Sequence, residues 1–219
     1  MTVDTEIPVA KASRSGPRAR TRRLLLHEAS AMLCAGLVPS VAEVAARAGV
    51  SRATAYRYFP SRSRLISSVV EDSLGPVRLL SSTNPDGRAR IVELFVETFP
   101  RLTENEPQLR AALQLSLEDT ARERAGTLKE EPYRRGHRRE ILSHAATPLK
   151  PLLGKRRFDR LVRALSVVYG IEVFVVLRDI WGSSDKEIAG IARWVAVSLV
   201  DAALREADPC FKRSTKGGR

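Results

Sequence analysis

Apolar residues recur every three or four positions along most of the chain, which is the spacing of an amphipathic helix. The apolar–polar alternation of a half-buried strand is not seen. Over residues 18–35 the pattern predicts a helix that Gly36 ends, with an inner stripe of Leu25, Leu26, Ala29, Met32 and Leu33. The fold class expected from this pattern is all-α.

Two short helical patterns meet at a glycine. Ser40 and Glu43 have the spacing of a capping box and predict a helix over residues 41–48. Gly49 can adopt the left-handed backbone that ends this helix, and a second helix follows over residues 52–59. Two helices joined by a short turn that contains glycine predict a helix-turn-helix.

The second short helix has one apolar side and one polar side. Ala55 and Phe59 are four residues apart and share the face that points into a small core. The outward positions are Arg52, Ala53, Thr54, Tyr56, Arg57 and Tyr58. Arginine can bind guanine edges, and tyrosine and threonine hydroxyls can reach phosphates, so this face suits a DNA groove. A solvated helix with its long side chains along the surface is the other interpretation.

The rest of the chain predicts a larger helical body. Ser61 caps a fourth helix that runs to residue 74 or 80, and residues 81–87 form a loop. Further helices are expected over residues 88–102, 106–124, 134–153, 156–181 and 185–206. The expected division is a disordered basic arm (1–17), a helix-turn-helix domain (18–64), a helical body (65–206) and a polar tail (207–219).

The positive charge of the N-terminal part of the chain indicates phosphate groups as a candidate partner. The net charge is +12, and residues 1–64 hold eleven basic residues against four acidic ones. Residues 11–23 alone hold six basic residues and no acidic one. This run is either a solvated tail or an arm that phosphate attracts beside the helix-turn-helix.

Cysteine use and hydropathy indicate a cytoplasmic protein without a membrane partner. Cys34 and Cys210 are far apart and form no disulfide framework. Residues 1–23 are polar and basic, unlike a signal peptide. The most apolar run, residues 161–177, contains Arg163 and Glu172, which favours a buried helix over a membrane span.

The stretch "VAEVAARAGVSRATAYRYFPSRSRL" resembles the DNA-binding head of the TetR family of bacterial transcriptional regulators. The resemblance covers about residues 18–70. It includes the small Ala45, the turn at residues 49–51, the aromatic pair at residues 58–59 and a basic residue that opens the fourth helix. Two positions depart from the family: Arg62 stands where lysine is usual, and Ala55 is smaller than the usual apolar residue.

The resemblance implies a DNA site. It places base-edge contacts on Arg52, Ala53 and Thr54, with Arg57 as a further candidate, and phosphate contacts on Tyr56, Tyr58 and Arg62. With the capping Ser51, the expected DNA-binding residues are Ser51, Arg52, Ala53, Thr54, Tyr56, Arg57, Tyr58 and Arg62. The implied partner is a pseudopalindromic double-stranded operator.

The resemblance also implies a homodimer formed by the two C-terminal helices and a small-molecule effector bound in the body. The stripe Ile188, Ile191, Val195, Leu199 and Ala202 is the candidate dimer interface, unless it is an ordinary core stripe. The candidate ligand residues are Phe95, Phe99, Leu113, Leu117, Tyr169, Phe174 and Trp181, which supply a mostly apolar surface or else fill a solid core.

Catalytic and metal signals are poor. His27, His137 and His144 have no cysteine or carboxylate partners at metal-ligand spacing, so no metal or cofactor is expected. "RRGHRRE", residues 134–140, is an anion-binding candidate or a solvated helix face. The sequence predicts a non-enzymatic transcriptional regulator of the repressor type, released by a small apolar effector. A sequence-nonspecific DNA-binding protein and a helical enzyme with a basic surface are the alternatives.

Overall fold

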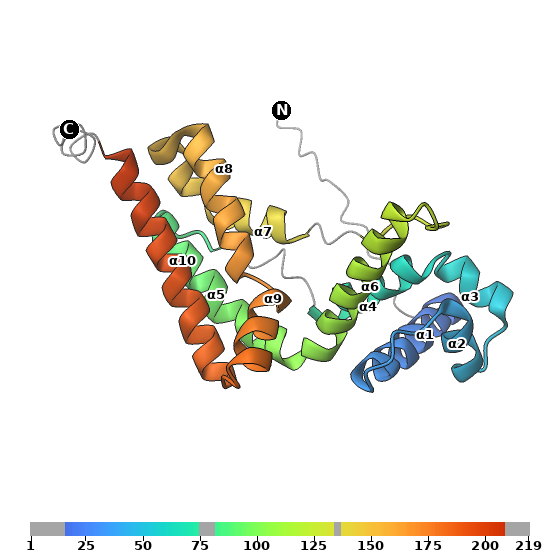
Figure 1. Cartoon of the computed structure of the whole chain (residues 1–219). Helices are drawn as coiled ribbons and strands as arrows, with labels where there is room; N and C mark the ends of the chain where they lie inside the picture. Colours follow the sequence, from blue (N-terminus) through green and yellow to red (C-terminus); the bar gives the residue numbers. More distant parts are fainter. Residues whose placement is uncertain (1–15, 75–81, 134–136, 209–219) are drawn as a thin grey trace, which may run out of the picture.

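The computed structural model describes residues 16–74, 82–133 and 137–208, and every regular element in these ranges is helical. Figure 1 shows a small head of α1 to α3 at one end and the C-terminal helices α8 and α10 at the other. The elements are α1 (Pro17–Cys34), α2 (Val41–Arg47), α3 (Arg52–Tyr58), α4 (Arg62–Leu74), α5 (Gly87–Glu104), α6 (Glu106–Arg124), α7 (His137–Ala145), η2 (Thr147–Leu149), α8 (Lys150–Val168), α9 (Ile171–Phe174), η3 (Val175–Ile180) and α10 (Asp185–Ala207).

Local sequence signals define the two short helices of the head. The Glu43 amide donates to Ser40 Oγ at 3.2 Å, and the Ser40 amide donates to Glu43 Oε2 at 2.7 Å. This reciprocal pair confirms the predicted capping box at the start of α2. Gly49 has a φ of 63°, so the turn between α2 and α3 uses the left-handed conformation that glycine permits. The all-α fold with an N-terminal helix-turn-helix is confirmed.

The two helices predicted over residues 134–153 and 156–181 are wrong. The short η2 separates α7 from α8, and α8 begins at Lys150 and runs through Gly154, where the backbone is non-helical. Gly170, with a φ of 134°, ends this helix. This φ favours glycine, and a Cβ at residue 170 would lie 2.3 Å from Nη2 of Arg138, so the guanidinium would also have to shift. The helical period continues across these breaks, which hid them from the sequence.

Beyond Gly170 the chain forms α9 and then η3, a π-helical turn. Among the described residues, none of the helices is long and apolar enough to cross a membrane. The basic arm up to residue 15, the possible extension of α4 over residues 75–80, and the tail from residue 209 lie outside the described residues, as do residues 134–136 of the anion-binding candidate.

The molecule has two apolar clusters. The body cluster joins α5, α7, α8, α9 and α10, and the head cluster joins α1, α2, α3 and α4. The head cluster also contains Ala111, Ala112 and Leu115 of α6, together with Tyr133. The head core therefore extends past the predicted boundary at residue 64, because a helix of the body closes one side of it.

Candidate nucleic-acid interface

The outward face of α3 is an exposed set of polar and small side chains. Arg52, Ala53, Tyr56 and Arg57 are exposed, while Thr54 and Tyr58 are half-buried. Ala55 and Phe59 are buried in the head cluster, as the four-residue spacing predicted. The sequence thus predicted which face of α3 the fold leaves for a partner.

Three contacts fix the orientation of α3. Ser51 Oγ accepts a hydrogen bond from the Thr54 amide at 3.2 Å and donates to Thr54 Oγ1 at 2.9 Å. The buried Phe59 holds the far end of the helix, and the Arg22 guanidinium lies 5.7 Å from the centre of its ring. Ser51 is therefore a capping residue, and its hydroxyl is already used within the protein.

One arginine of α1, Arg22, reaches the end of α3 at Phe59, and α1 carries further exposed arginines. Arg18, Arg20, Arg22 and Arg23 of α1 are exposed. A short exposed helix with two arginines fits a major groove about 12 Å wide, and nearby arginines can meet the flanking phosphates. The geometry allows base-edge contacts from α3 and backbone contacts from α1.

Arg62 lies elsewhere. Its Nη2 donates to the Val38 carbonyl at 2.5 Å, and its Nη1 donates to Glu118 Oε2 at 3.2 Å. Its Nε is buried and has no hydrogen-bond partner among the residues that the structure describes. The guanidinium fastens the start of α4 to α6 and to the loop before α2, so it does not join the exposed face of α3. Glu118 is 56 residues away in sequence, which is why the sequence did not reveal this pairing.

Comparisons with known proteins agree with the head geometry. Residues 39–69 match the family model described as bacterial regulatory proteins, tetR family. The head is a TetR-family DNA-binding domain. The HTH-type transcriptional repressor LfrR of Mycolicibacterium smegmatis is 40% identical over 55 residues, which are 25% of this chain and 29% of that repressor. The match thus spans less than a third of the relative, and no solved structure matches.

The matched family is described as one of bacterial regulatory proteins, and the relative is a transcriptional repressor. Among the described residues, no group of three or more His, Cys, Asp or Glu side chains is placed to hold a metal ion.

A cleft of about 610 Å³ lies between the head and the body. The end of α1 and the loop after it form one wall, and the end of α5, the start of α6, η3 and the start of α10 form the other. Its lining residues are Leu33, Cys34, Gly36, Val38, Thr103, Glu104, Glu106, Pro107, Arg110, Ala111, Gln114, Arg178 and Asp185. The cleft was not expected from the sequence, because its walls come from five separate segments.

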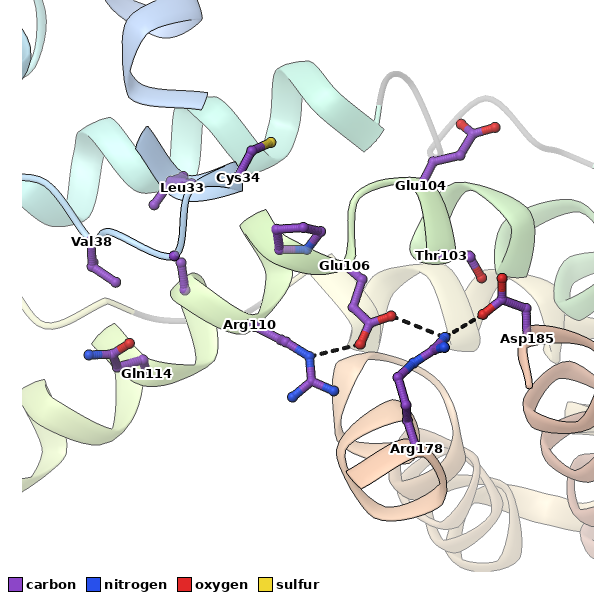
Figure 2. A pocket seen from close by; sticks show the side chains of 13 residues that line it. Leu33, Cys34, Val38, Thr103, Glu104, Glu106, Arg110, Gln114, Arg178 and Asp185 are labelled. Carbon is purple, nitrogen blue, oxygen red and sulfur yellow. Dashed lines mark hydrogen bonds and ion pairs between the residues drawn. The ribbon is translucent and has the colours of Figure 1, made fainter. Parts of the chain in front are cut away.

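A chain of ion pairs crosses the body side of this cleft. Figure 2 shows Glu106 between two arginines, with Arg110 Nε at 2.7 Å and Arg178 Nη2 at 3.1 Å. Arg110 also forms a two-bond pair with Asp179 at 2.8 and 2.6 Å, and Arg178 also pairs with Asp185. The hydrogen bonds from Arg110 hold the pKa of Asp179 below its ordinary value. The network ties the first turn of α6 to η3 and α10.

Other hydrogen bonds tie α6 to the head. The buried Gln108 donates from Nε2 to Ser30 Oγ at 3.3 Å and to Cys34 Sγ at 3.1 Å, and no described residue bonds its Oε1. Further along α6, Asp119 Oδ2 accepts from Ser63 Oγ at 3.3 Å and from the Tyr133 amide at 2.8 Å. Helix α6 is therefore bonded to the head on one side and to the body on the other.

The predicted ligand residues separate into two groups. Phe95, Phe99, Tyr169 and Phe174 meet in the body core, with neighbouring ring centres 5.3 to 6.4 Å apart. Burial raises the pKa of Tyr169 to about 12. Leu113 is half-buried against this cluster.

Two of the predicted ligand residues do not line a site with the others. Leu117 is 62% exposed and Trp181 is 75% exposed, so both lie at the surface. Leu117 faces away from the cluster on α6, and Trp181 follows η3. The sequence expectation fails for these two residues because helix spacing alone does not say which neighbour each face meets.

Only part of the predicted dimer stripe on α10 lies at the surface of the protomer. The residues of α10 that are buried in the core of the protomer are Ile188, Ala192, Ala196, Val200 and Ala203. Ile188 is fully buried, so it cannot contact a second copy. Ile191 is 39% exposed, and Val195, Leu199 and Ala202 are half-buried. Trp194, 69% exposed, lies on the same outer side. The structure therefore leaves an apolar outer strip on α10, defined by Ile191, Trp194, Val195 and Ala202.

Proposed function

We propose that this protein is a homodimeric repressor that binds a pseudopalindromic operator through α3 and releases it when a small molecule binds the protein. The observation that supports DNA reading is the exposed face of α3, where Arg52 and Arg57 project from a helix held by Ser51 and Phe59. Within the part of the chain that the structure describes, neither arginine forms an ion pair, unlike Arg47, which pairs with Glu28 at 2.8 Å.

The apolar strip of α10 supports the dimer. On α8 the exposed Val167 lies two turns from Arg160, and Arg160 forms an ion pair with Glu206 of α10. The outer faces of α8 and α10 therefore adjoin. Exposed Trp194 and Val167 on adjoining helices form a patch of the kind that a second copy covers in a symmetric dimer. Two linked heads would then read half-sites about 34–36 Å apart, or a multiple of that spacing.

The cleft between head and body is the proposed place for an effector. The aromatic cluster is filled by its own rings, whereas the cleft is open and has an apolar wall of Leu33, Val38 and Pro107. A ligand that separates the end of α1 from α6 would disturb the contacts that orient the head. Because coupling is reciprocal, operator DNA must then weaken ligand binding by the same factor.

Selection of duplexes from a random library by the full chain tests the proposal. A sequence-specific repressor enriches a two-fold symmetric site, and a nonspecific binder enriches none. On the enriched site, Arg52→Ala should weaken binding by about 5- to 150-fold per half-site, and should flatten the preference at one or two bases. Arg193→Ala, an exposed arginine of α10, is the matched control. If both variants bind the selected site equally well, α3 does not read the bases.

The effector step has its own measurement. Cys34 lines the cleft and is exposed, so in a Cys210→Ser variant its alkylation rate reports whether the cleft is occupied. Compounds are screened for protection of Cys34 and, in parallel, for release of the selected duplex. A compound that protects Cys34 but leaves duplex affinity unchanged contradicts the coupling without contradicting DNA recognition.

A further inference from the structure

A chain of hydrogen bonds runs from one wall of the cleft to the other. Val38, on the loop after α1, lines the head wall, and Gln114 of α6 lines the body wall. Figure 2 shows both side chains at the end of the cleft away from Asp185. Gln114 Nε2 donates to Glu118 Oε1 at 2.9 Å, and Glu118 Oε2 accepts from Arg62. Arg62 also donates to the Val38 carbonyl, which completes a connection that we call the Arg62 clasp.

Arg62 is the member of the clasp that joins the two sides. Its Nη2 lies 2.5 Å from the carbonyl oxygen of Val38, and its Nη1 lies 3.2 Å from Glu118 Oε2 on α6. The guanidinium is planar and rigid, so its nitrogens cannot follow two partners that move apart. Widening of the cleft at Val38 must therefore break one of the two contacts of Arg62.

The surroundings of Arg62 leave room for an open arrangement. Its buried Nε has no partner among the described residues, which costs free energy in the closed arrangement. Arg62 also lines a second cavity, of about 250 Å³, between the start of α4, α6 and the loop after α6. The guanidinium therefore has space to leave the Val38 carbonyl and stay close to α6.

The place of Arg62 in the chain connects the clasp to the helix proposed to read DNA. Helix α3 ends at Tyr58, and three residues separate it from Arg62, the first residue of α4. One of the three is Pro60, whose ring fixes a backbone angle, and another is Phe59, which is buried in the head cluster. A movement at the start of α4 therefore reaches α3 through a short and restrained connection.

We propose that Arg62 is a positioning residue that makes the affinity for operator DNA depend on the width of the cleft. While the cleft is narrow, the clasp holds the loop before α2 against α6 and supports the head. An occupant that moves this loop away from α6 breaks the bond to Val38, and the head loses that support. This role of Arg62 rests on the proposed function, in which the cleft is the effector site, and adds the residues that carry the effect to the head.

The test changes the width of the cleft covalently at Cys34, in the full chain with Cys210→Ser. Cys34 lines the cleft and is exposed, so N-ethylmaleimide gives a small adduct there and N-(1-pyrenyl)maleimide a bulky one. The readout is the ratio of the dissociation constants of the two adducts for the selected duplex, in which the loss of the thiol itself cancels. In the parent chain the bulky adduct should bind about 5- to 150-fold more weakly, the usual range of coupling between sites.

Removal of the clasp should remove this dependence. Arg62→Met keeps an unbranched side chain but loses both hydrogen bonds, so the ratio should fall toward one. The matched control is Arg64→Met, because Arg64 lies on the same helix and pairs with Glu131, which does not line the cleft. This control should keep the parent ratio. If thermal melts show that Arg62→Met does not fold, Glu118→Gln replaces it, since the amide keeps the size of the side chain and removes its charge; it should also lower the ratio.

The outcomes separate the clasp from the cleft. Equal ratios in the clasp variant and in Arg64→Met would overturn the role of Arg62 and leave the cleft as a control site. A ratio of one in the parent chain would contradict the effector site itself, and the role of Arg62 with it.

Salt dependence gives an independent check on Arg62. A positioning residue neutralises no phosphate, so Arg62→Met should leave the slope of log affinity against log salt unchanged. A slope lowered by about 0.9 per half-site would instead place Arg62 at a DNA phosphate and overturn the proposal.

Discussion

Leu115 connects the body to the head, and its truncation should loosen the head selectively. It is 1% exposed and lies on α6, yet it packs in the head cluster with residues of α1 to α4. Leu115→Ala removes buried methyl groups and leaves a cavity among rigid neighbours. Truncations of this kind cost about 2–4 kcal/mol, which is roughly a 30- to 800-fold change in an opening equilibrium. The loss should fall on the head because the cavity opens into its core.

Hydrogen exchange followed by mass spectrometry measures this change segment by segment. Leu115→Ala should lower the protection of peptides from α1 to α4 by the predicted factor and leave α8 and α10 near the parent value. The matched control is Leu153→Ala, the same truncation at a residue 2% exposed in the body cluster. It should show the opposite distribution. If Leu115→Ala instead lowers protection in α5 and α10 and spares the head, α6 belongs to the body alone and the shared core is refuted.

Three further outcomes are expected. Trp194→Glu places a charge in the apolar strip of α10 and should shift the protein from dimer to monomer in sedimentation velocity; a variant that stays dimeric moves the interface elsewhere. Hydrogen bonds at the start of α2 lower the pKa of Glu43, so its stabilising effect is present above its unfolded pKa and is lost as pH falls through the lower folded pKa. Thermal melts of Glu43→Gln should therefore lose part of the acid dependence of the parent chain, and identical pH profiles would contradict this assignment. Arg110→Ala breaks the ion pairs to Glu106 and Asp179, which should loosen the body wall of the cleft and speed alkylation of Cys34; an unchanged rate would show that the network does not limit access to Cys34.

The sequence by itself determined the local structure of the head. The capping pairs, the glycine at the turn and the four-residue spacing of Ala55 and Phe59 act within one or two helical turns. Interactions of such short range are readable from the order of residues, because few tertiary arrangements can change them. For this reason the orientation of α3, including the exposure of Arg52 and Arg57, was predictable.

The tertiary structure decided which segment each face of a long helix packs against. Arg62 was expected to contact DNA phosphate. Its guanidinium instead pairs with Glu118, which is far away in sequence. Ile188 shares its helical period with Ile191, and only packing against the body core buries the first and leaves the second at the surface.

The breaks between the C-terminal helices also depend on contacts between segments that are distant in sequence. Gly170 interrupts a continuous apolar period, and the Arg138 guanidinium beside it donates to the Ser166 carbonyl before the break and to Glu172 after it. The cleft likewise requires α1, α5, α6, η3 and α10 to converge. Period and capping fix which face of a helix is apolar, whereas the partner of that face depends on contacts between segments distant in the chain, which the order of residues alone does not specify.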